Sequence, residues 1–279
     1  MKILCLGPAG TYGHEAATIA AKRLKRESLE IEFCQRNVDV IRRVDSEECY
    51  GVVPVENSTA GLVPDIVKDF WLEQSTDSLV CVVGEIQIAV SHNLLVHSST
   101  RSMGEIIKVI SHPQALAQCR TKLARFGLKK FEAVDSTALA ARYASEPLVY
   151  PNIAAISSRF AAEFYGLKMI AECIEDSPGN STRFHILGSD ENQKPTGNDR
   201  TAVLFWIPNR PGALLSALGT MWRVNMSSIH SIPLGTPSAY AFYCEFDEHK
   251  FSDVGGEVLL GLEKLTDRLL VLGSYPKEV

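Results

Sequence analysis

Residues 189–199, which read SDENQKPTGND, divide the sequence into two parts of different organisation. These residues include no large apolar side chain, and they contain a proline and a glycine, as linkers between folded units often do. Apolar runs and helical patterns alternate before this stretch, and a shorter series of elements follows it. We therefore expect a linker at 189–199 between a larger and a smaller folded unit.

The larger part, residues 1–188, contains short apolar runs separated by segments with helical spacing of apolar residues. The runs that we expect to form strands are 2–6, 31–34, 51–57, 79–90, 108–111, 154–157 and 168–174. The segments that we expect to form helices are 14–26, 62–73, 113–126, 136–145 and 158–165. Because strands alternating with helices favour parallel sheets, this part is expected to form one or two doubly wound α/β lobes.

The smaller part, residues 200–279, has its own order of elements. Its apolar pattern predicts strands at 201–207, 226–232, 239–246 and 268–273, with helices at 211–222 and 253–264. Pro211 suits the first turn of a helix, where its missing N–H has no partner to lose. The resulting order, βαββαβ, is that of a ferredoxin-like unit.

Composition narrows the class of protein. The 279 residues are 46% apolar and 22% charged, which is ordinary for a soluble globular protein. A net charge of −5 argues against nucleic acid or an anionic membrane as the main partner, and no stretch approaches the ~20 apolar residues of a membrane helix. The amino terminus has no secretion signal, and seven scattered cysteines predict reduced thiols in a cytoplasmic protein. We expect no metal site, since HEAAT at 14–18 lacks the second histidine of a zinc helix.

Polar residues gather where predicted strands give way to helices or turns. The segments are LGPAGTYGHEAA (6–17), VPVENSTAG (53–61), VISHPQALAQC (109–119) and VDSTALAARY (134–143). Ligands of α/β proteins bind at the carboxyl ends of strands, although the same residue types also cap helices. Taken singly, each junction is open to both interpretations, and His112 alone is typical of a helix start. Together they predict a cleft that binds an anionic small molecule through backbone N–H groups and neutral donors.

Two further stretches are ambiguous when taken alone. The glycine-rich turn at 6–17 has the spacing G-x-x-G-x-x-G, which differs from the dinucleotide fingerprint, and it lacks the lysine of a phosphate-binding loop. A nicotinamide oxidoreductase is therefore a weak alternative. The stretch GNSTRFHILG (179–188) enters a strand through Thr182 and Arg183. Either a turn precedes an edge strand here, or these two side chains point into a site.

In this order, the motifs GPAGTYGHEAA, GVVPVENSTAG, SHPQALAQC, STALAA and NSTRF resemble those of prephenate dehydratases. The segment IPNRPGALLSAL, followed by NMSSIHSIP, resembles the ACT domain that these enzymes carry. The resemblance spans essentially the whole chain. Because the first motif stands at the start of the sequence, we expect a monofunctional enzyme with no chorismate mutase segment in front.

The resemblance implies a two-lobed catalytic domain over 1–188, similar to periplasmic binding proteins, with the active site between the lobes. By analogy, one lobe would hold 1–83 with 161–188, the other would hold 84–160, and the ACT domain would span 200–279. Thr182 corresponds to the essential threonine of the family, Arg183 to an arginine that binds a substrate carboxylate, and Phe184 to an aromatic residue of the pocket. The other matching cleft positions are Thr11, Asn57, Ser58, Ser111, Gln114, Ser136 and Thr137. Gly13 and His14 depart from the common pattern of the first loop.

The implied reaction is the conversion of prephenate to phenylpyruvate in L-phenylalanine biosynthesis, with loss of CO₂ and the ring hydroxyl and without a cofactor. Thr182 would donate a hydrogen bond to the leaving oxygen, and Arg183 would hold the carboxylate of the pyruvyl side chain. An arogenate dehydratase would use the same chemistry on the amino analogue. A non-catalytic amino-acid sensor is another alternative, but it has no need of the threonine. A decarboxylase that retains the hydroxyl should lack the TRF motif.

The ACT resemblance implies feedback by L-phenylalanine bound between paired domains, and hence a homodimer or homotetramer. One effector loop is present as Gly212, Ala213 and Leu214. The other, usually Glu-Ser-Arg-Pro, is here His230, Ser231, Ile232 and Pro233. We therefore expect feedback through backbone contacts with altered affinity or selectivity among aromatic amino acids; the alternative is a purely structural dimerisation module.

Overall fold

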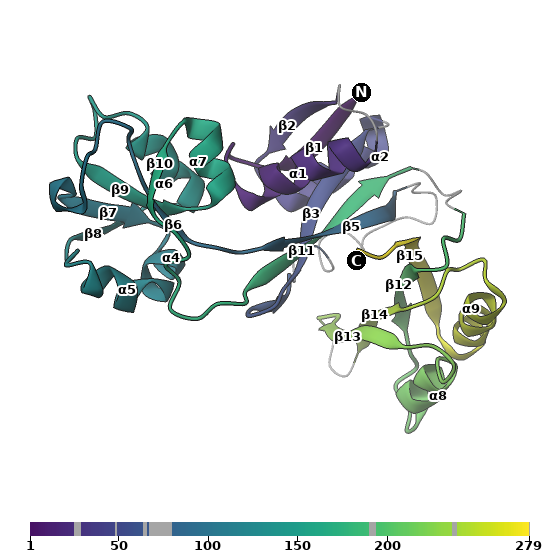
Figure 1. The fold of residues 1–279 in the computed structure, drawn as a ribbon. Coiled ribbons are helices and arrows are strands. Elements are labelled where there is room, and N and C mark those ends of the chain that lie inside the picture. Colours follow the sequence, from purple (N-terminus) through teal and green to yellow (C-terminus); the bar gives the residue numbers. More distant parts are fainter. Residues whose placement is uncertain are drawn as a thin grey trace.

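The computed structural model of the chain describes residues 1–24, 29–47, 49–63, 66, 80–189, 194–235 and 239–278. These residues form two α/β lobes, each built on its own sheet, and a third unit built on a further sheet (Figure 1). None of the described helices is long and apolar enough to cross a membrane. The expected fold class, a two-lobed α/β domain with an additional ferredoxin-like unit, is confirmed.

The first lobe has a sheet of strand order β2-β1-β3-β11-β5, with the short β4 paired to β3. Its strands are β1 (Lys2–Leu6), β2 (Glu30–Cys34), β3 (Tyr50–Asn57), β4 (Gly61–Leu62), β5 (Cys81–Ala89) and β11 (Ser181–Gly188). Strand β11 runs antiparallel to both of its neighbours, so a late segment of the chain fills the gap between two early strands. Helix α1 (Tyr12–Arg23) packs in the core cluster that contains Ile3, and helix α2 (Asn37–Glu47) packs in the core cluster that contains Leu4.

The second lobe is continuous in sequence and has the strand order β10-β6-β9-β7-β8. Its strands are β6 (Asn93–Val96), β7 (Lys108–Ser111), β8 (Phe131–Ala133), β9 (Ile153–Ser157) and β10 (Lys168–Ala171). Its helices are α4 (Pro113–Gln118), α5 (Arg120–Arg125), α6 (Thr137–Ala144) and α7 (Arg159–Tyr165), with a short 3₁₀ turn, η2 (Met103–Glu105). Two crossings of the chain, after β5 and before β11, join this lobe to the first (Figure 1).

The third unit has the expected order βαββαβ. Its elements are β12 (Asp199–Trp206), α8 (Ala213–Gly219), β13 (Met226–Pro233), β14 (Tyr240–Phe246), α9 (Asp253–Leu265) and β15 (Arg268–Pro276). One face of its antiparallel sheet packs on α8 and α9 through side chains such as Phe205 and Leu262. Leu204 and Tyr243 belong instead to the core cluster that contains Leu4 of the first lobe. The third sheet therefore shares a hydrophobic core with the first lobe.

The lobe boundaries expected near 84 and 161 were wrong. Strand β5 stays in the first lobe to Ala89, which pairs with Ser181 of β11. Strand β10 pairs antiparallel with β6, so the second lobe retains the chain to Ala171. The expected linker ends one residue early, because β12 begins at Asp199.

Several expected elements also changed. The helix expected at 113–126 is divided into α4 and α5, which meet at Cys119. Helix α2 and strands β6 and β8 were not predicted. The helix expected at 62–73 lies mostly outside the described residues.

The third unit approaches the first lobe along β5 and β15, and Gly273 lies at a point of very close approach. A Cβ atom at Gly273 would lie 2.2 Å from the carbonyl oxygen of Val82 and 2.7 Å from its amide nitrogen. Near the end of the chain, Glu278 forms an ion pair with Arg23, and its amide donates to Glu85 Oε1 at 3.0 Å. This side of the interface therefore depends on a residue without a side chain.

Replacing Gly273 by alanine should force β15 away from β5 and lower the free energy of unfolding by about 1–3 kcal/mol, the usual cost of overpacking. The matched control is Gly219→Ala at the end of α8, where a Cβ would meet nothing within 4 Å. There the change should be neutral or stabilising, because alanine favours helix. Urea denaturation of both variants measures the difference. Equal losses would contradict the close approach.

Candidate active site

A cavity of about 380 Å³ lies between the two lobes, within the size range of small-molecule sites. The first lobe contributes residues from α1, β3 and β11, and the second contributes residues at the starts of α4 and α6. The described residues that line it are Tyr12, Asn57, Ala60, Val90, His92, His112, Gln114, Ala115, Gln118, Asp135, Ser136, Thr137, Asn180 and Thr182. Five residues expected from the sequence are among them: Asn57, Gln114, Ser136, Thr137 and Thr182.

Thr182 and Asn57 form the centre of the first-lobe wall. They are paired in register on β11 and β3, and Asn57 Nδ2 donates to Thr182 Oγ1 at 3.0 Å. The same nitrogen donates to Asn180 Oδ1 at 2.8 Å. Asn57 Oδ1 accepts from the backbone N–H groups of Thr59 and Ala60, each at 3.0 Å, which fixes the orientation of the amide. Because the threonine hydroxyl accepts this hydrogen bond, its own proton is available for a ligand in the cavity.

The second-lobe wall is built from helix starts. Ser136 is the N-cap of α6, and its Oγ accepts from Leu139 N at 3.0 Å. His112 is the N-cap of α4, and its Nδ1 accepts from Gln114 N at 3.3 Å. Thr137 and Gln114 follow these caps and line the cavity. At Ser136 the two interpretations left open by the sequence hold together, because the capping residue is also part of the cavity wall.

Three expected cleft residues do not line this cavity. Thr11 caps α1, accepting from His14 N at 3.2 Å and donating to Pro8 O at 3.0 Å. Ser111 is fully buried and donates to Ile156 O at 2.7 Å. Ser58 lines an adjoining cavity of about 510 Å³, where it accepts from Ser181 N at 2.9 Å. The hydrogen bonds of Thr11 and Ser111 show that they stabilise the loops that present the cavity residues.

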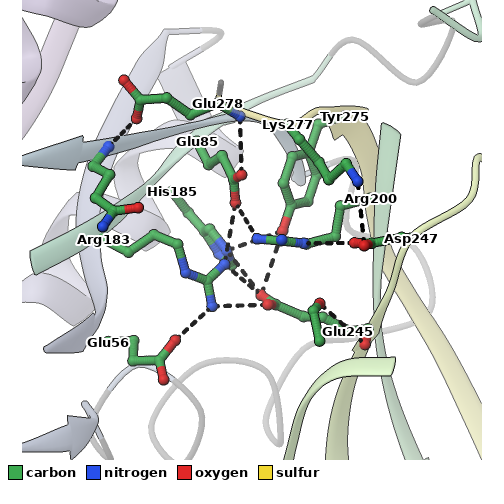
Figure 2. Close-up of polar contacts among 12 residues, drawn as sticks. Glu56, Glu85, Arg183, His185, Arg200, Glu245, Asp247, Tyr275, Lys277 and Glu278 are labelled. Carbon is green, nitrogen blue, oxygen red and sulfur yellow. Dashed lines mark hydrogen bonds and ion pairs between the residues drawn. The ribbon is translucent and has the colours of Figure 1, made fainter. Parts of the chain in front are cut away.

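Arg183 points away from the cavity. Its guanidinium makes a two-pronged contact with Glu245 of the third unit, at 2.9 Å from Nη1 to Oε1 and 2.7 Å from Nη2 to Oε2 (Figure 2). It also contacts Glu56 Oε2 at 2.9 Å and Glu85 Oε2 at 3.2 Å. Side chains alternate between the faces of a strand, so Arg183 cannot accompany Thr182 into the cavity. The expectation that Arg183 binds a substrate carboxylate therefore does not fit this geometry.

Phe184 does not line the cavity either. It is 3% exposed and belongs to the core cluster that contains Ile3 and Ile86. The pairing register between β11 and β3 shifts between Arg183 and Phe184. Phe184 thus stabilises the lobe, and the pocket role expected for it does not fit.

Arg183 belongs to a buried and half-buried set of charged and polar groups that we call the Arg183 cluster: Arg183, His185, Glu85, Arg200, Glu245, Tyr243 and Tyr275. Burial alone would raise the pKa of the Glu245 carboxyl, but the contacts with His185 and Arg183 outweigh it and hold that pKa well below its ordinary value. Burial lowers the pKa of His185, which Glu245 offsets only in part. Tyr243 donates a hydrogen bond to Glu245, and Arg200 pairs with Glu85 at 2.9 Å. The cluster therefore joins the first lobe to the third unit through compensated charges.

The structure also adds cavity residues that sequence reasoning missed: Tyr12, His92, Gln118, Asp135 and Asn180. Tyr12, Gln118, Asp135 and Asn180 lie inside the stretches quoted above, so membership of those stretches was an available indication for them. His92 stands outside every motif. Within the described part of the chain, no group of three or more His, Cys, Asp or Glu side chains is placed to hold a metal ion.

A separate cavity of about 590 Å³ lies in the third unit beside α8. Gly212, Ala213 and Leu214 line it, as expected for the first effector loop, together with Tyr240 and Phe242. His230 and Ser231 lie on β13 and are not among its described lining residues. Within one chain, only the first of the two expected effector segments therefore contributes to this cavity.

The sequence profile of the prephenate dehydratase family matches residues 3–192. The prephenate dehydratase of Lactococcus lactis subsp. lactis is 36% identical over 287 residues, which cover 99% of this chain and 97% of that protein. Several solved structures are similar over nearly the whole chain, among them two whose descriptions name different activities. The prephenate dehydratase of Arthrobacter aurescens in complex with L-Phe has a TM-score of 0.84 at 26% identity, covering 99% of this chain and 90% of that one.

Another similar structure, GqqA, is described as a novel type of quorum-quenching acylase. It has a TM-score of 0.85 at 29% identity, covering 100% of this chain and 98% of that one. Proteins described by two different activities therefore share this fold, so the activity must be argued from the cavity and not from the fold alone.

The Arg183 cluster predicts how stability depends on Glu245. In Glu245→Gln, the carboxylates that still contact Arg183 among the described residues are Glu56 and Glu85. The free energy of unfolding near neutral pH should therefore fall by about 3 kcal/mol, as for a broken buried pair. The pKa of Glu245 is lower in the folded protein, so its contribution is complete above the unfolded pKa of about 4.3 and is lost as the pH falls further. The difference between wild type and variant should therefore shrink in acid.

Urea denaturation over a series of pH values tests this dependence. Glu132→Gln is the control, because it removes a carboxylate from an exposed pair with Lys108 and should cost far less. A loss in Glu245→Gln that matches the control, or that does not change with pH, would count against the cluster as a stabilising link.

Proposed function

This chain belongs to the prephenate dehydratase family, and from that premise we propose that it converts prephenate to phenylpyruvate, the decarboxylating dehydration of L-phenylalanine biosynthesis. The observation that carries the proposal is the Thr182 hydroxyl, which accepts a hydrogen bond from Asn57 and keeps its proton for the cavity. A departing hydroxide needs such a donor. Because the reaction breaks the bond between a ring carbon and the hydroxyl oxygen, the enzyme would be a carbon–oxygen lyase.

The chemistry requires little beyond orientation and one well-placed donor. The bond between the ring and its carboxylate breaks to release CO₂, its electron pair enters the ring, and the ring carbon–oxygen bond breaks toward the hydroxyl. The ring becomes aromatic, which supplies the driving force, and the hydroxide is protonated to water. A preorganised donor of this kind is typically worth about 3–4 kcal/mol in the transition state. No redox step occurs, so the proposal needs no cofactor.

An acylase is the second candidate, because one structural neighbour is described as such. Acyl transfer by a side-chain nucleophile needs a hydroxyl or thiol next to a base. Thr182 Oγ1 contacts the amide of Asn57, and Ser136 Oγ accepts from a backbone N–H, so neither has a base among the hydrogen-bond partners that the structure describes. This arrangement favours dehydration over acyl transfer. A sensor without activity would have no use for the Thr182 donor.

The keto and amino forms of the substrate differ only in the side chain, so arogenate remains the alternative substrate. The cavity offers neutral donors at Gln114 and Thr137, which bind a carboxylate in either compound. Assays of the two compounds side by side separate a prephenate from an arogenate dehydratase.

We further propose that L-phenylalanine is the effector and that the third unit, an ACT domain, pairs with a second copy in a homodimer or homotetramer. The cavity beside α8 supports the first point, since it carries the glycine-rich loop and two aromatic walls. Leu215 and Trp222 support the second, because they are 77% and 81% exposed in the single chain. All seven cysteines lie in described segments as thiols, which supports a cytoplasmic location.

The purified protein should produce phenylpyruvate from prephenate in the presence of a chelator, measured by ultraviolet absorbance. Thr182→Ala should lower kcat by roughly 10²–10³ and change KM only several-fold, because the lost hydrogen bond strengthens mainly in the transition state. Thr182→Ser should retain more activity. Thr266→Ala, on the third unit and remote from the cavity, is the matched control and should behave as wild type. Absence of phenylpyruvate, or equal rates for Thr182→Ala and wild type, would reject the proposal.

L-phenylalanine should bind the protein and change its initial rate or KM roughly 5-fold or more, within the usual range of allosteric coupling. Calorimetry with phenylalanine, tyrosine and tryptophan gives the selectivity. Leu214→Ala should weaken binding because Leu214 lines the cavity, whereas Leu260→Ala on the exposed side of α9 should not. If none of the three amino acids binds or alters the rate at millimolar concentration, the regulatory proposal fails and the enzyme assignment stands.

A further inference from the structure

Glu245 is a fully buried carboxylate on β14 of the third unit, and its neighbours hold it in one place. Its two oxygens contact the terminal nitrogens of Arg183, at 2.9 Å from Nη1 to Oε1 and 2.7 Å from Nη2 to Oε2 (Figure 2). The hydroxyls of Tyr243 and Tyr275 donate to Oε1, and His185 Nε2 lies 3.3 Å from the same oxygen. A carboxylate with this many fixed neighbours is a rigid anchor for Arg183.

The backbone next to Thr182 is irregular on the side of β3. Arg183 pairs with Glu56 but Phe184 pairs with Pro54, so one residue of β3 is left over, as in a β-bulge. Pro54 has no N–H group to donate to β11. Bulges occur often beside active sites, where they change the direction of side chains. The backbone contacts with β3 therefore fix the Thr182 end of β11 less firmly than a regular ladder would.

The Arg183 side chain bridges this irregular place. It contacts Glu56, its register partner on β3, at 2.9 Å between Nη2 and Oε2, and it contacts Glu85 on β5 at 3.2 Å. The Glu56 side chain is 35% exposed, so solvent screens that pair, and Glu85 is shared with Arg200. Glu245 is fully buried and meets both prongs of the guanidinium, so it is the strongest of these anchors.

Thr182 directly precedes Arg183, so the two residues share one stretch of backbone. The Thr182 hydroxyl accepts from Asn57 Nδ2 at 3.0 Å on the cavity side. A donor to a departing hydroxide has to be placed accurately, because a displacement of about 1 Å can cost roughly 10²-fold in rate. The contacts that hold Arg183 therefore also limit where the Thr182 hydroxyl can lie.

We propose that Glu245 is a positioning residue of the active site. By holding Arg183 it fixes the backbone of β11 that presents the Thr182 hydroxyl to the cavity, so the third unit contributes to catalysis. Glu245 lies with Arg183 on the face of β11 opposite the cavity, and it acts through the strand and not on the substrate. The inference rests on the proposed function, which makes Thr182 the donor to the leaving oxygen.

This positioning role can be separated from the stability that the same ion pair provides. Arg200 on β12 crosses the same boundary, contacting Glu85 at 2.9 Å, and it also contacts Asp247 at 3.4 Å. Its side chain is 17% exposed, which is close to the 11% of Arg183. Arg200→Gln therefore removes a largely buried charge from the interface and leaves the contact between Glu245 and Arg183 in place. It is the matched control.

Glu245→Gln should lower kcat for prephenate by roughly 10–100-fold and change KM only several-fold, because a misplaced donor matters most in the transition state. Arg183→Lys should show the same division between kcat and KM, since lysine cannot reproduce the two-pronged contact. Arg200→Gln should lose stability in urea and keep the kcat of wild type. The rates are measured at a temperature at which circular dichroism shows every variant to be folded.

The decisive comparison is made in the Thr182→Ala background. If Glu245 acts through the Thr182 hydroxyl, Glu245→Gln has little left to remove there and should lower kcat by no more than about 2-fold. A general disturbance of the fold would lower kcat by the same factor in both backgrounds. Equal factors, or a kcat of Glu245→Gln equal to that of wild type, would overturn the proposal.

A second variant covers the case in which Glu245→Gln does not fold. Glu245→Asp keeps the charge but is one methylene too short for the two-pronged contact. It should lower kcat in smaller measure, and again only when the Thr182 hydroxyl is present. A kcat equal to that of wild type would count against the proposal here too.

Threonine methyl spectra report the position of Thr182 without any turnover. The Thr182 signal, identified by its absence in Thr182→Ala, should shift in Glu245→Gln and stay in place in Arg200→Gln. A signal that does not move in Glu245→Gln would reject the positioning role. If wild type does not convert prephenate, the proposed function fails, and the spectra still decide whether Glu245 positions Thr182. Turnover by wild type with unchanged kcat in Glu245→Gln would reject this inference alone.

Discussion

The two-pronged contact between Arg183 and Glu245 is the interaction on which the arrangement of this molecule depends. Each partner belongs to a different folded unit. Glu245 is fully buried and the Arg183 side chain is only 11% exposed, so either one alone would be a poorly compensated charge. Glu85 and Arg200 repeat the exchange across the same boundary. Each unit therefore carries charged side chains whose ion-pair partners lie on the other unit. The shared apolar core adds area to this interface, but the charge pairs fix the orientation in which the units meet.

Strand β11 connects this interface to the candidate active site, because it carries a residue of each. Thr182 and Arg183 are consecutive, and the pleat of the strand sends one side chain to the cavity and the other to the third unit. The carboxylate of Glu245 is therefore connected to the candidate catalytic hydroxyl through a single residue. Asn57 holds the hydroxyl on the cavity side, and Glu56, the residue before it, contacts Arg183 on the other. On both β3 and β11, one residue therefore faces the cavity and its neighbour in sequence contacts the Arg183–Glu245 interface.

Much of the architecture could be predicted from local patterns. The linker at 189–199 was predicted from composition, and the βαββαβ order was predicted from apolar periodicity. Both properties can be read from short segments without knowledge of their contacts. Asn57 and Thr182 were identified through motifs, and the cavity brings them together. Helix α2 was missed although Val40, Ile41 and Val44 have helical spacing and are buried. Its many charged residues obscured the apolar face.

What could not be predicted depends on contacts that are remote in sequence. The role of Arg183 depends on Glu245, which belongs to another folded unit, although strand alternation alone argued against Thr182 and Arg183 facing one cavity. The lobe boundaries failed because an apolar run does not say which sheet it joins; β5 is fixed in the first lobe by its pairing with β11. His92 stood outside every motif, and it is the packing of the two chain crossings that places this residue at the cavity.

The position of β11 also has a consequence for how the chain is made on the ribosome. The second lobe, from β6 to β10, is contiguous and can assemble as soon as its residues have emerged. The first lobe begins earlier but must wait, because β3 and β5 have no strand between them until residues 181–188 are synthesised. Even then Arg183 has no Glu245 beside it until β14 follows. During translation the oldest part of the chain is therefore the last to be completed, and its open strand edges are the segments that most need protection from aggregation.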